Sequence, residues 1–180
     1  MCKFFLTSLT SILFFQVLLF SGEVVHLKFD ADLKDSAGGR LGRVIGPPVS
    51  YTADRFGNPG SAVLLKKGSR ISLGNEGLSF GRDGKVQPFT VEWYQRYDAN
   101  GAGLGVGILK KNNEYRIAWN NRFRLHTDDH ANGGALSRNG STSLKYGQWT
   151  HIAVVFENAG AGGIRFYQDG EPVSPVMKDG

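Results

Sequence analysis

The sequence predicts an all-β protein, a sandwich or barrel of short strands. Apolar residues recur at every second position along most of the chain, which is the period of a half-buried strand. Dipeptides that permit tight turns lie between or near these segments, at residues 100–101, 132–133, 139–140 and 169–170. No convincing amphipathic helix is present.

Residues 1–22 differ from the rest of the chain. Lys3 precedes an apolar run that ends before Ser21. A cation followed by such a run is typical of a secretory signal peptide, and an uncleaved N-terminal membrane anchor is the alternative. We therefore predict a secreted protein, extracellular or periplasmic, with one domain over residues 23–180; it contacts a membrane only if the N-terminal segment is retained.

Composition and charge agree with a single folded domain. The 180 residues are 41% hydrophobic and 21% charged, and Cys2 is the only cysteine. The domain after the N-terminal segment would therefore have no disulfide and would depend on its core. The formal net charge of +5 falls by one to +4 without Lys3. This mild excess, without clustered Lys and Arg, predicts no nucleic-acid binding.

The predicted strands follow one another between turns. They are residues 24–29, 61–65, 70–73, 89–96, 114–119, 122–126, 149–156 and 164–168. The segment 89–96 shows the pattern best, because Phe89, Val91 and Trp93 share one face of an extended chain. Polar side chains occupy the other face.

Two glycine patterns invite functional interpretations. GLSFG, around Ser79, matches the serine elbow of esterases, but an elbow needs a following helix and a parallel sheet, and the glycines and Pro88 downstream predict a loop. GAGLGVG, residues 101–107, does not match a nucleotide-binding loop. We expect a strand there whose glycines leave one face bare, either for close sheet packing or for a ligand.

Five segments together resemble a laminin-G-like domain of the concanavalin A-like lectin/glucanase superfamily. They are VVHLKFDADLKDSAGG, DRFGNPGSAVLLKKGSRISLG, PFTVEWYQRYD, GILKKNNEYRIAW and YGQWTHIAVVFENAGAGGIRFYQDGEPV. The resemblance implies an antiparallel jelly-roll β-sandwich of concanavalin A-like lectin type. It also implies a domain that binds glycans or proteins and is not catalytic by itself.

Two departures from the family pattern affect these expectations. Lys66, Lys67, Gly68 and Ser69 stand where the family commonly has an acidic pair, so calcium is not expected in that loop. The family continues past the Tyr-x-x-Gly hairpin with further strands, whereas this chain stops at Gly180. We expect the last strands to be missing or supplied by another chain, with a homodimer through an open sheet edge as one outcome.

The sequence offers no catalytic pair. Glucanases of this superfamily carry Glu-x-Asp-x-(x)-Glu on one strand, because alternate residues point into the same groove. That pattern is absent. Glu92 and Asp98 would lie roughly 20 Å apart on a regular strand, too far for a retaining pair. We predict no enzyme activity and no catalytic residues.

Metal binding has one weak candidate, the segment HTDDHANGG, which we expect to be a loop. Asp128, Asp129 and Asn132 offer the hard oxygen ligands that calcium prefers. Three ligands are fewer than calcium normally takes, so a solvated turn is the favoured interpretation. No cofactor is expected.

Alternation predicts the ligand-binding residues. If Phe89, Val91, Trp93, Ile117, Phe123 and Leu125 face the core, polar residues of the same strands emerge on the opposite side. These residues are Glu92, Tyr94, Arg96, Arg116, Asn120, Arg124 and His126. Arginine forks bind carboxylates or sulfates, and a tyrosine ring stacks on sugars. The pattern indicates one shallow groove for an acidic glycan; an ordinary solvated face is the alternative.

The combined prediction is a secreted, noncatalytic carbohydrate-recognition module for acidic glycans. The first alternative is an extracellular protein-interaction or adhesion module that a partner strand completes. The second is a fragment or accessory domain of a secreted glycoside hydrolase. These alternatives share the same predicted fold, so the fold alone does not separate them.

Overall fold

The computed structural model describes nine segments of the chain. They are residues 25–74, 76–78, 88–97, 106–111, 114–119, 123–129, 134–140, 144–157 and 163–173. Every regular element within them is a β-strand, and all strand pairs are antiparallel. These segments therefore contain no helix that could cross a membrane. The predicted signal or anchor, residues 1–22, lies outside them.

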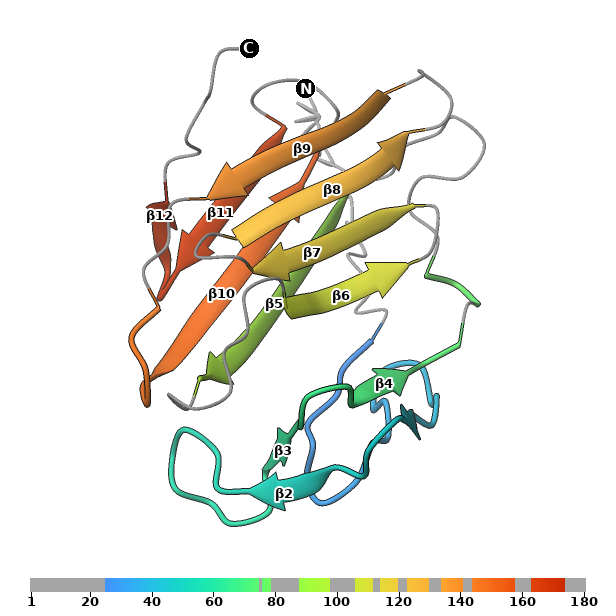
Figure 1. Cartoon of the computed structure of the whole chain (residues 1–180), viewed down its shortest axis with the longest axis vertical. Coiled ribbons are helices and arrows are strands. Elements are labelled where there is room, and N and C mark those ends of the chain that lie inside the picture. Colours follow the sequence, from blue (N-terminus) through green and yellow to red (C-terminus); the bar gives the residue numbers. More distant parts are fainter. Residues whose placement is uncertain are drawn as a thin grey trace, which may run out of the picture.

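Two four-stranded sheets lie one in front of the other (Figure 1). One contains, in spatial order, β12 (Glu171–Val173), β11 (Ile164–Gln168), β10 (Trp149–Phe156) and β5 (Phe89–Arg96). The other contains β6 (Val106–Lys111), β7 (Tyr115–Trp119), β8 (Phe123–Asp129) and β9 (Gly134–Gly140). The predicted all-β antiparallel sandwich is confirmed.

A smaller unit, here called the N-terminal ribbon, lies at one end of the sandwich (Figure 1). It pairs β1 (Arg43–Ile45) with β4 (Arg70–Ser72) and β2 (Ser50–Thr52) with β3 (Ala62–Leu64). Two glycines let the ribbon bend between these pairs. A Cβ on Gly46 would lie 2.3 Å from the Gly68 carbonyl oxygen, so only glycine allows the backbones to approach this closely.

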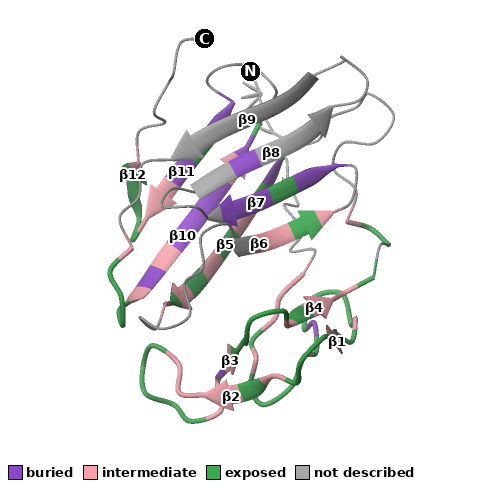
Figure 2. Ribbon diagram, viewed as in Figure 1, coloured by how far each residue is buried: buried purple, intermediate pink, exposed green. Residues whose placement is uncertain are grey.

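The hydrophobic core lies between the two large sheets. Its buried members are Phe89, Tyr115, Ile117, Leu125, Ile152, Val154, Phe156, Ile164 and Phe166. The Phe89 ring lies 5.2 Å from that of Phe156 and 5.2 Å from that of Tyr115, measured between centroids. Buried positions concentrate on these strands, while the ribbon is mostly exposed or intermediate (Figure 2).

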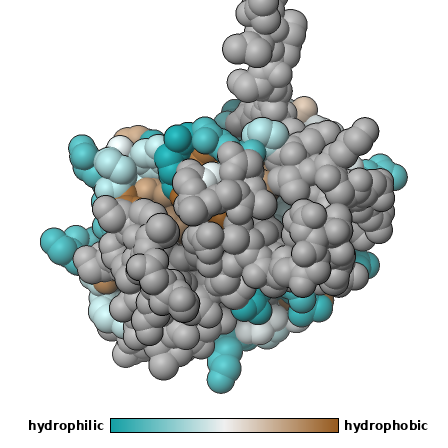
Figure 3. Space-filling model, turned by 90° about the horizontal axis from the view of Figure 1, so that it is seen from above, coloured by the Kyte–Doolittle hydropathy of each residue, from teal (hydrophilic) through white to brown (hydrophobic). Residues whose placement is uncertain are grey.

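The inward positions predicted from alternation are borne out where the structure describes the side chains. Phe89, Ile117 and Leu125 are buried, and Val91 and Trp93 pack partly buried against the same core. Seen from the top of Figure 1, hydrophobic side chains among the coloured residues show only in small areas between hydrophilic ones (Figure 3).

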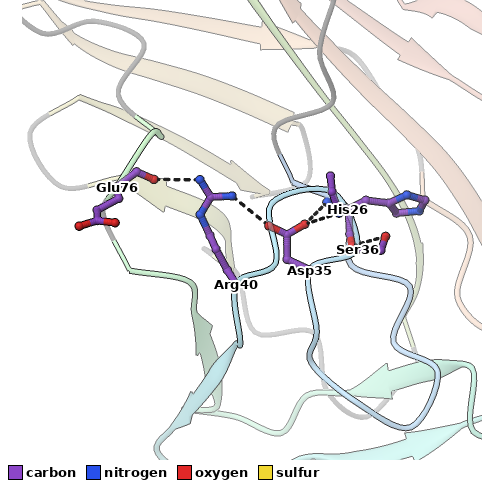
Figure 4. Close-up of polar contacts among 6 residues, drawn as sticks. His26, Asp35, Ser36, Arg40 and Glu76 are labelled. Atoms are coloured by element: carbon purple, nitrogen blue, oxygen red, sulfur yellow. Dashed lines mark hydrogen bonds and ion pairs between the residues drawn. The ribbon is translucent and has the colours of Figure 1, made fainter.

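A buried carboxylate organises the start of the described chain (Figure 4). Asp35 accepts hydrogen bonds from the backbone N–H groups of His26 at 2.9 Å and Ala37 at 3.0 Å, and from Arg40 Nη1 at 2.9 Å. The His26 bond lowers the pKa of Asp35 most; burial raises it, and bonds from Gly38, Arg40 and Ala37 lower it further. The net result is a pKa well below the usual range.

Arg40 and Tyr115 connect this corner to the sandwich. Arg40 Nη2 donates to the Glu76 carbonyl at 3.1 Å, and the Tyr115 hydroxyl donates to the Leu78 carbonyl at 3.3 Å. Burial, followed by the nearby charge of Glu114, raises the pKa of Tyr115 to about 12. The hydroxyl therefore keeps its proton and its hydrogen bond at physiological pH.

Two strand predictions need correction at the N-terminal end of the chain and at β6. Residues 25–29 make only the isolated bridge Leu27 to Asp35, because Phe29 at φ 61° and Ala31 at φ 56° interrupt the extended chain. In β6, the register shifts between Gly107 and Leu109, so the strand expected around residues 101–107 does not continue with regular alternation. Ile108 and Leu109 consequently both pack against the core.

Turn predictions had mixed outcomes. Asp169 at φ 51° and Gly170 at φ 86° form the tight turn between β11 and β12, as predicted. Asn139 and Gly140 do not form a turn; they lie in β9 and pair with Arg124 and Phe123. The dipeptides at 100–101 and 132–133 lie outside the described residues.

The esterase-like pattern lacks the strand context of a serine elbow. β4, which precedes it, is paired antiparallel with β1, whereas an elbow serine follows a strand of a parallel sheet. Ser79 itself lies outside the described residues.

We predict that Phe156→Ala lowers the free energy of unfolding by about 3–5 kcal/mol, because it leaves a cavity between the two sheets. Urea denaturation measures this change. Tyr146→Ala is the control: this tyrosine is 58% exposed, and its removal should cost less than about 0.5 kcal/mol. Equal losses for both variants would contradict the assigned core.

A second prediction concerns pH. The folded-state pKa of Asp35 is lowered, so its contribution to stability is full above the ordinary carboxyl value of about 4 and is lost as the pH falls below it. Asp35→Asn should lower the melting temperature at neutral pH and flatten its decline in acid, as measured by thermal unfolding. Asp30→Asn, at an exposed position, should behave as wild type.

Candidate functional site

The outer face of β5 and β10 gathers aromatic and charged side chains. The antiparallel register sets Arg96 opposite Trp149 and Tyr94 opposite His151. Residues directly opposite in such a ladder share a face of the sheet. The Phe89 side of the same strands is buried in the core, so these pairs lie on the outside of the sandwich.

Tyr94 and His151 form the centre of this face. Their ring centroids lie 4.6 Å apart with an interplanar angle of 35°. His151 Nε2 lies 3.5 Å from Glu92 Oε2, and Glu92 is largely exposed. The Tyr94 side chain therefore has an aromatic neighbour on the adjacent strand, yet the residue stays 48% exposed.

Arg96 and Trp149 extend the face toward the end of β5. The Arg96 guanidinium carbon lies 5.4 Å from the Trp149 ring centroid, which is within the range of a cation–π contact. The neighbouring inward position is also ordered, because Trp93 Nε1 donates to Gln95 Oε1 at 2.9 Å. The strand thus presents cationic and aromatic side chains outside and a mainly apolar surface inside, where Gln95 bonds to Trp93.

The turn after β11 holds the backbone of His151. Asp169 Oδ1 accepts a hydrogen bond from the His151 N–H at 2.9 Å, and the Asp169 N–H donates to the His151 carbonyl at 2.9 Å. The positive φ of Asp169 belongs to this turn. Both backbone polar groups of His151, the N–H and the carbonyl, are therefore hydrogen-bonded to Asp169.

A loop of the N-terminal ribbon, residues 53–61, reaches this face. Asp54 Oδ1 accepts hydrogen bonds from the N–H groups of Phe56 at 2.8 Å and Asn58 at 2.9 Å, and Oδ2 accepts from Asn58 Nδ2 at 3.0 Å. The Asp54 N–H donates to the Asn58 carbonyl at 3.1 Å. One aspartate therefore closes the loop on itself.

Hydrogen bonding keeps this aspartate charged. Burial alone would raise the pKa of Asp54, but the Asn58 side chain and the N–H groups of Asn58, Phe56 and Gly57 together lower it. The carboxylate accepts all of these bonds only in its charged form. The loop should consequently keep its shape into mildly acidic conditions.

The closed loop places Arg55 over Tyr94 of the strand face, with Phe56 against Arg55. The Arg55 guanidinium carbon lies 3.6 Å from the Tyr94 ring centroid and 4.2 Å from the Phe56 ring centroid. Phe56 is 72% exposed. The site that results, here called the β5–β10 face, comprises Arg55, Phe56, Glu92, Tyr94, Arg96, Trp149 and His151.

The structure divides the predicted ligand-binding residues between two sheets. Glu92, Tyr94 and Arg96 lie together on β5, but exposed Arg116 lies on β7 of the other sheet. Arg124 and His126 lie on β8, paired with Ala118 and Arg116, and Asn120 lies outside the described residues.

The prediction of one shared groove is therefore wrong. The buried sides of β5 and β7 pack against each other, so the outward positions of the two sheets face away from one another. Alternation within a strand does not reveal this, because it reports which side of a strand is polar and not which sheet holds the strand.

The candidate metal segment also differs from its prediction. β8 continues through Asp128 and Asp129, which pair with Ala135 and Gly134, so these two residues are not in a loop. Asn132 lies outside the described residues. Among the residues that the structure describes, no group of three His, Cys, Asp or Glu side chains could hold a metal ion.

Four residues of the β5–β10 face escaped the sequence reasoning, namely Arg55, Phe56, Trp149 and His151. Alternation in residues 149–156 could have marked Trp149 and His151 as outward, because Ile152 and Val154 are the apolar partners of the opposite parity. Arg55 and Phe56 gave no such signal. The contact of Arg55 with Tyr94 joins segments that are distant in sequence.

Comparison with known families agrees with this architecture. A family model described as the concanavalin A-like lectin/glucanases superfamily matches residues 67–176, which include both four-stranded sheets. Searches of curated proteins and of solved structures returned no match. Arg55 and Phe56 precede the matched range, whereas the other residues of the β5–β10 face lie within it.

We predict that Asp54→Ala opens the 53–61 loop. The amides of Phe56 and Asn58 lose their acceptor, so their hydrogen–deuterium exchange should accelerate at least tenfold, as expected for a local hydrogen bond worth roughly 1.4 kcal/mol. Asp32→Ala is the matched control, because Asp32 accepts the Lys34 N–H in the same manner but outside the 53–61 loop. Exchange at Phe56 should therefore stay as in the wild type in this variant. Unchanged exchange at Phe56 in Asp54→Ala would contradict the loop assignment.

Proposed function

Because this chain belongs to the concanavalin A-like lectin/glucanases superfamily, we propose that it is a noncatalytic carbohydrate-recognition module for acidic glycans. Laminin G-like and concanavalin A-like domains generally bind carbohydrates or proteins. The observation that carries the proposal is the β5–β10 face, where three aromatic rings lie beside two guanidinium groups. Aromatic rings pack on the apolar faces of sugars, and guanidinium forks bind their carboxylates or sulfates.

The charges of this face favour an acidic ligand. Arg55 and Arg96 supply two permanent cations, and the one carboxylate among the seven residues, Glu92, lies near His151. The Arg55 guanidinium lies over the Tyr94 ring and that of Arg96 over the Trp149 ring, and these contacts add no negative charge to the face. A neutral or acidic glycan fits this arrangement, and the acidic one gains the additional ionic contacts.

The noncatalytic part of the proposal rests on the carboxylates. Retaining hydrolysis needs two carboxyl groups about 5 Å apart. Strand β5 offers Glu92 and no second acid at an alternate position. Asp169, which lies near the same face, accepts the His151 N–H and serves the turn.

Location outside the cell completes the proposal. Laminin G-like domains are typically extracellular, and residues 1–22 have the composition of a secretory signal or an N-terminal anchor. A domain without disulfides is compatible with that environment because its core is continuous between two sheets.

A protein-interaction module is the second candidate, and one observation favours it. The N-terminal ribbon exposes large hydrophobic side chains, namely Leu41, Phe56, Leu64 and Leu65. Exposed apolar residues of this kind are typical of protein interfaces. A glycan array separates the two candidates: discrete hits support carbohydrate recognition, and silence together with a self-associated or partner-bound protein supports the interaction module.

We predict that Arg96→Ala weakens binding of the purified protein to polygalacturonate roughly tenfold, since a charge-assisted hydrogen bond is lost. Biolayer interferometry on the immobilised polymer measures this. Arg43→Ala, an exposed change on β1, is the control and should bind as wild type. If the loss follows Arg116→Ala instead, the binding face belongs to the other sheet and the β5–β10 assignment is wrong.

A further inference from the structure

Arg55 has an unusual environment for an exposed arginine. Its guanidinium carbon lies over two aromatic rings, 3.6 Å from the Tyr94 centroid and 4.2 Å from the Phe56 centroid. A guanidinium is planar and carries all its N–H donors at its edges. Contacts with ring faces therefore restrain the group without consuming its hydrogen-bonding capacity.

No acid neutralises Arg55 within the described part of the chain. The close pairs of basic and acidic side chains there are Arg40 with Asp35, His151 with Glu92 and Arg165 with Glu157. The nearest acid in sequence, Asp54, uses both carboxylate oxygens to accept hydrogen bonds within the loop. Arg55 is thus a positioned cation whose charge is not cancelled by these groups.

The loop also pre-organises this cation. Asp54 fixes the backbone on the C-terminal side of Arg55 through the Phe56 and Asn58 amides, and Gly57 adopts φ 89°, which a residue with a side chain rarely takes. A binding group held in place before the ligand arrives loses little conformational entropy on binding. The arrangement therefore favours ligand recognition by the Arg55 guanidinium, whose two-pronged N–H edge is already in position before binding.

We propose that Arg55 determines the specificity of the β5–β10 face for carboxylate-bearing sugars. Its N–H edge binds the planar carboxylate of a uronic acid residue in bidentate fashion, while exposed Phe56 packs on the sugar ring. This inference rests on the proposed carbohydrate function and adds the chemical group that is recognised and the residue that recognises it. Two parallel bonds require both planarity and charge, so lysine cannot replace the arginine.

The test uses a matched pair of ligands and a conservative substitution. The probes are an oligomer of galacturonic acid and the same oligomer with its carboxyl groups methyl-esterified, titrated into the full-length protein by calorimetry. The wild type should bind the free acid at least tenfold more tightly than the ester, since each charge-assisted contact contributes about that factor. Arg55→Lys, which keeps the charge, should reduce that preference about tenfold.

The controls separate this role from general electrostatics and from folding. Arg43→Lys changes an exposed arginine of the same ribbon and should keep the full preference. Circular dichroism of Arg55→Lys should match that of the wild type, because the side chain is exposed.

The outcomes distinguish this inference from the function on which it rests. An unchanged preference in Arg55→Lys overturns the role of Arg55 and leaves carbohydrate binding intact. A wild type that ignores the free acid but binds neutral or sulfated glycans on an array overturns the carboxylate assignment alone. A wild type that binds no glycan on the array overturns the proposed function and this inference together.

Discussion

The antiparallel ladder between β5 and β10 is the constraint on which the remaining structure depends. It pairs all eight residues of each strand, from Phe89 with Phe156 to Arg96 with Trp149. Because a strand alternates its sides, one register sets two surfaces at once. Phe89 and Phe156 stack within the core, while Tyr94 and His151 meet outside. A one-residue slip would bury the charged residues and expose the aromatic core.

The N-terminal ribbon is stabilised in a different way from the sandwich. Its strands are three residues long and bury little apolar surface, so polar contacts take a larger share. Asp35 holds the backbone together at one corner, and Asp54 closes one loop. Each carboxylate does so by accepting hydrogen bonds from several N–H groups. Both carboxylates remain charged because those donors stabilise the ionised form. The candidate site needs both units, since the ribbon supplies Arg55 and Phe56 to a face built by the large sheet.

The structural predictions were most accurate where the residue pattern of a single strand is enough to assign that strand. The alternation in residues 89–96 identified both the strand and its buried side, and the Asp169-Gly170 turn followed from residues that tolerate positive φ. The predictions failed where the backbone departs from regularity. Phe29 and Ala31 adopt positive φ without being glycine, and the bulge in β6 turns Ile108 and Leu109 toward the same core. The positive φ at Phe29 and Ala31 has no local sequence signal, whereas a glycine inside a strand, here Gly107, is a typical marker of a bulge.

The sequence by itself determined the all-β class, the inward and outward sides of the regular strands, and the presence of arginine and tyrosine on an outer side of β5. Only the tertiary structure decided which strands are neighbours. It separated Arg116 from Arg96 by placing them on different sheets, and it brought Arg55 of the ribbon onto Tyr94. The physical reason is that alternation arises from geometry between adjacent residues, whereas strand pairing is selected by the packing of side chains that are distant in sequence.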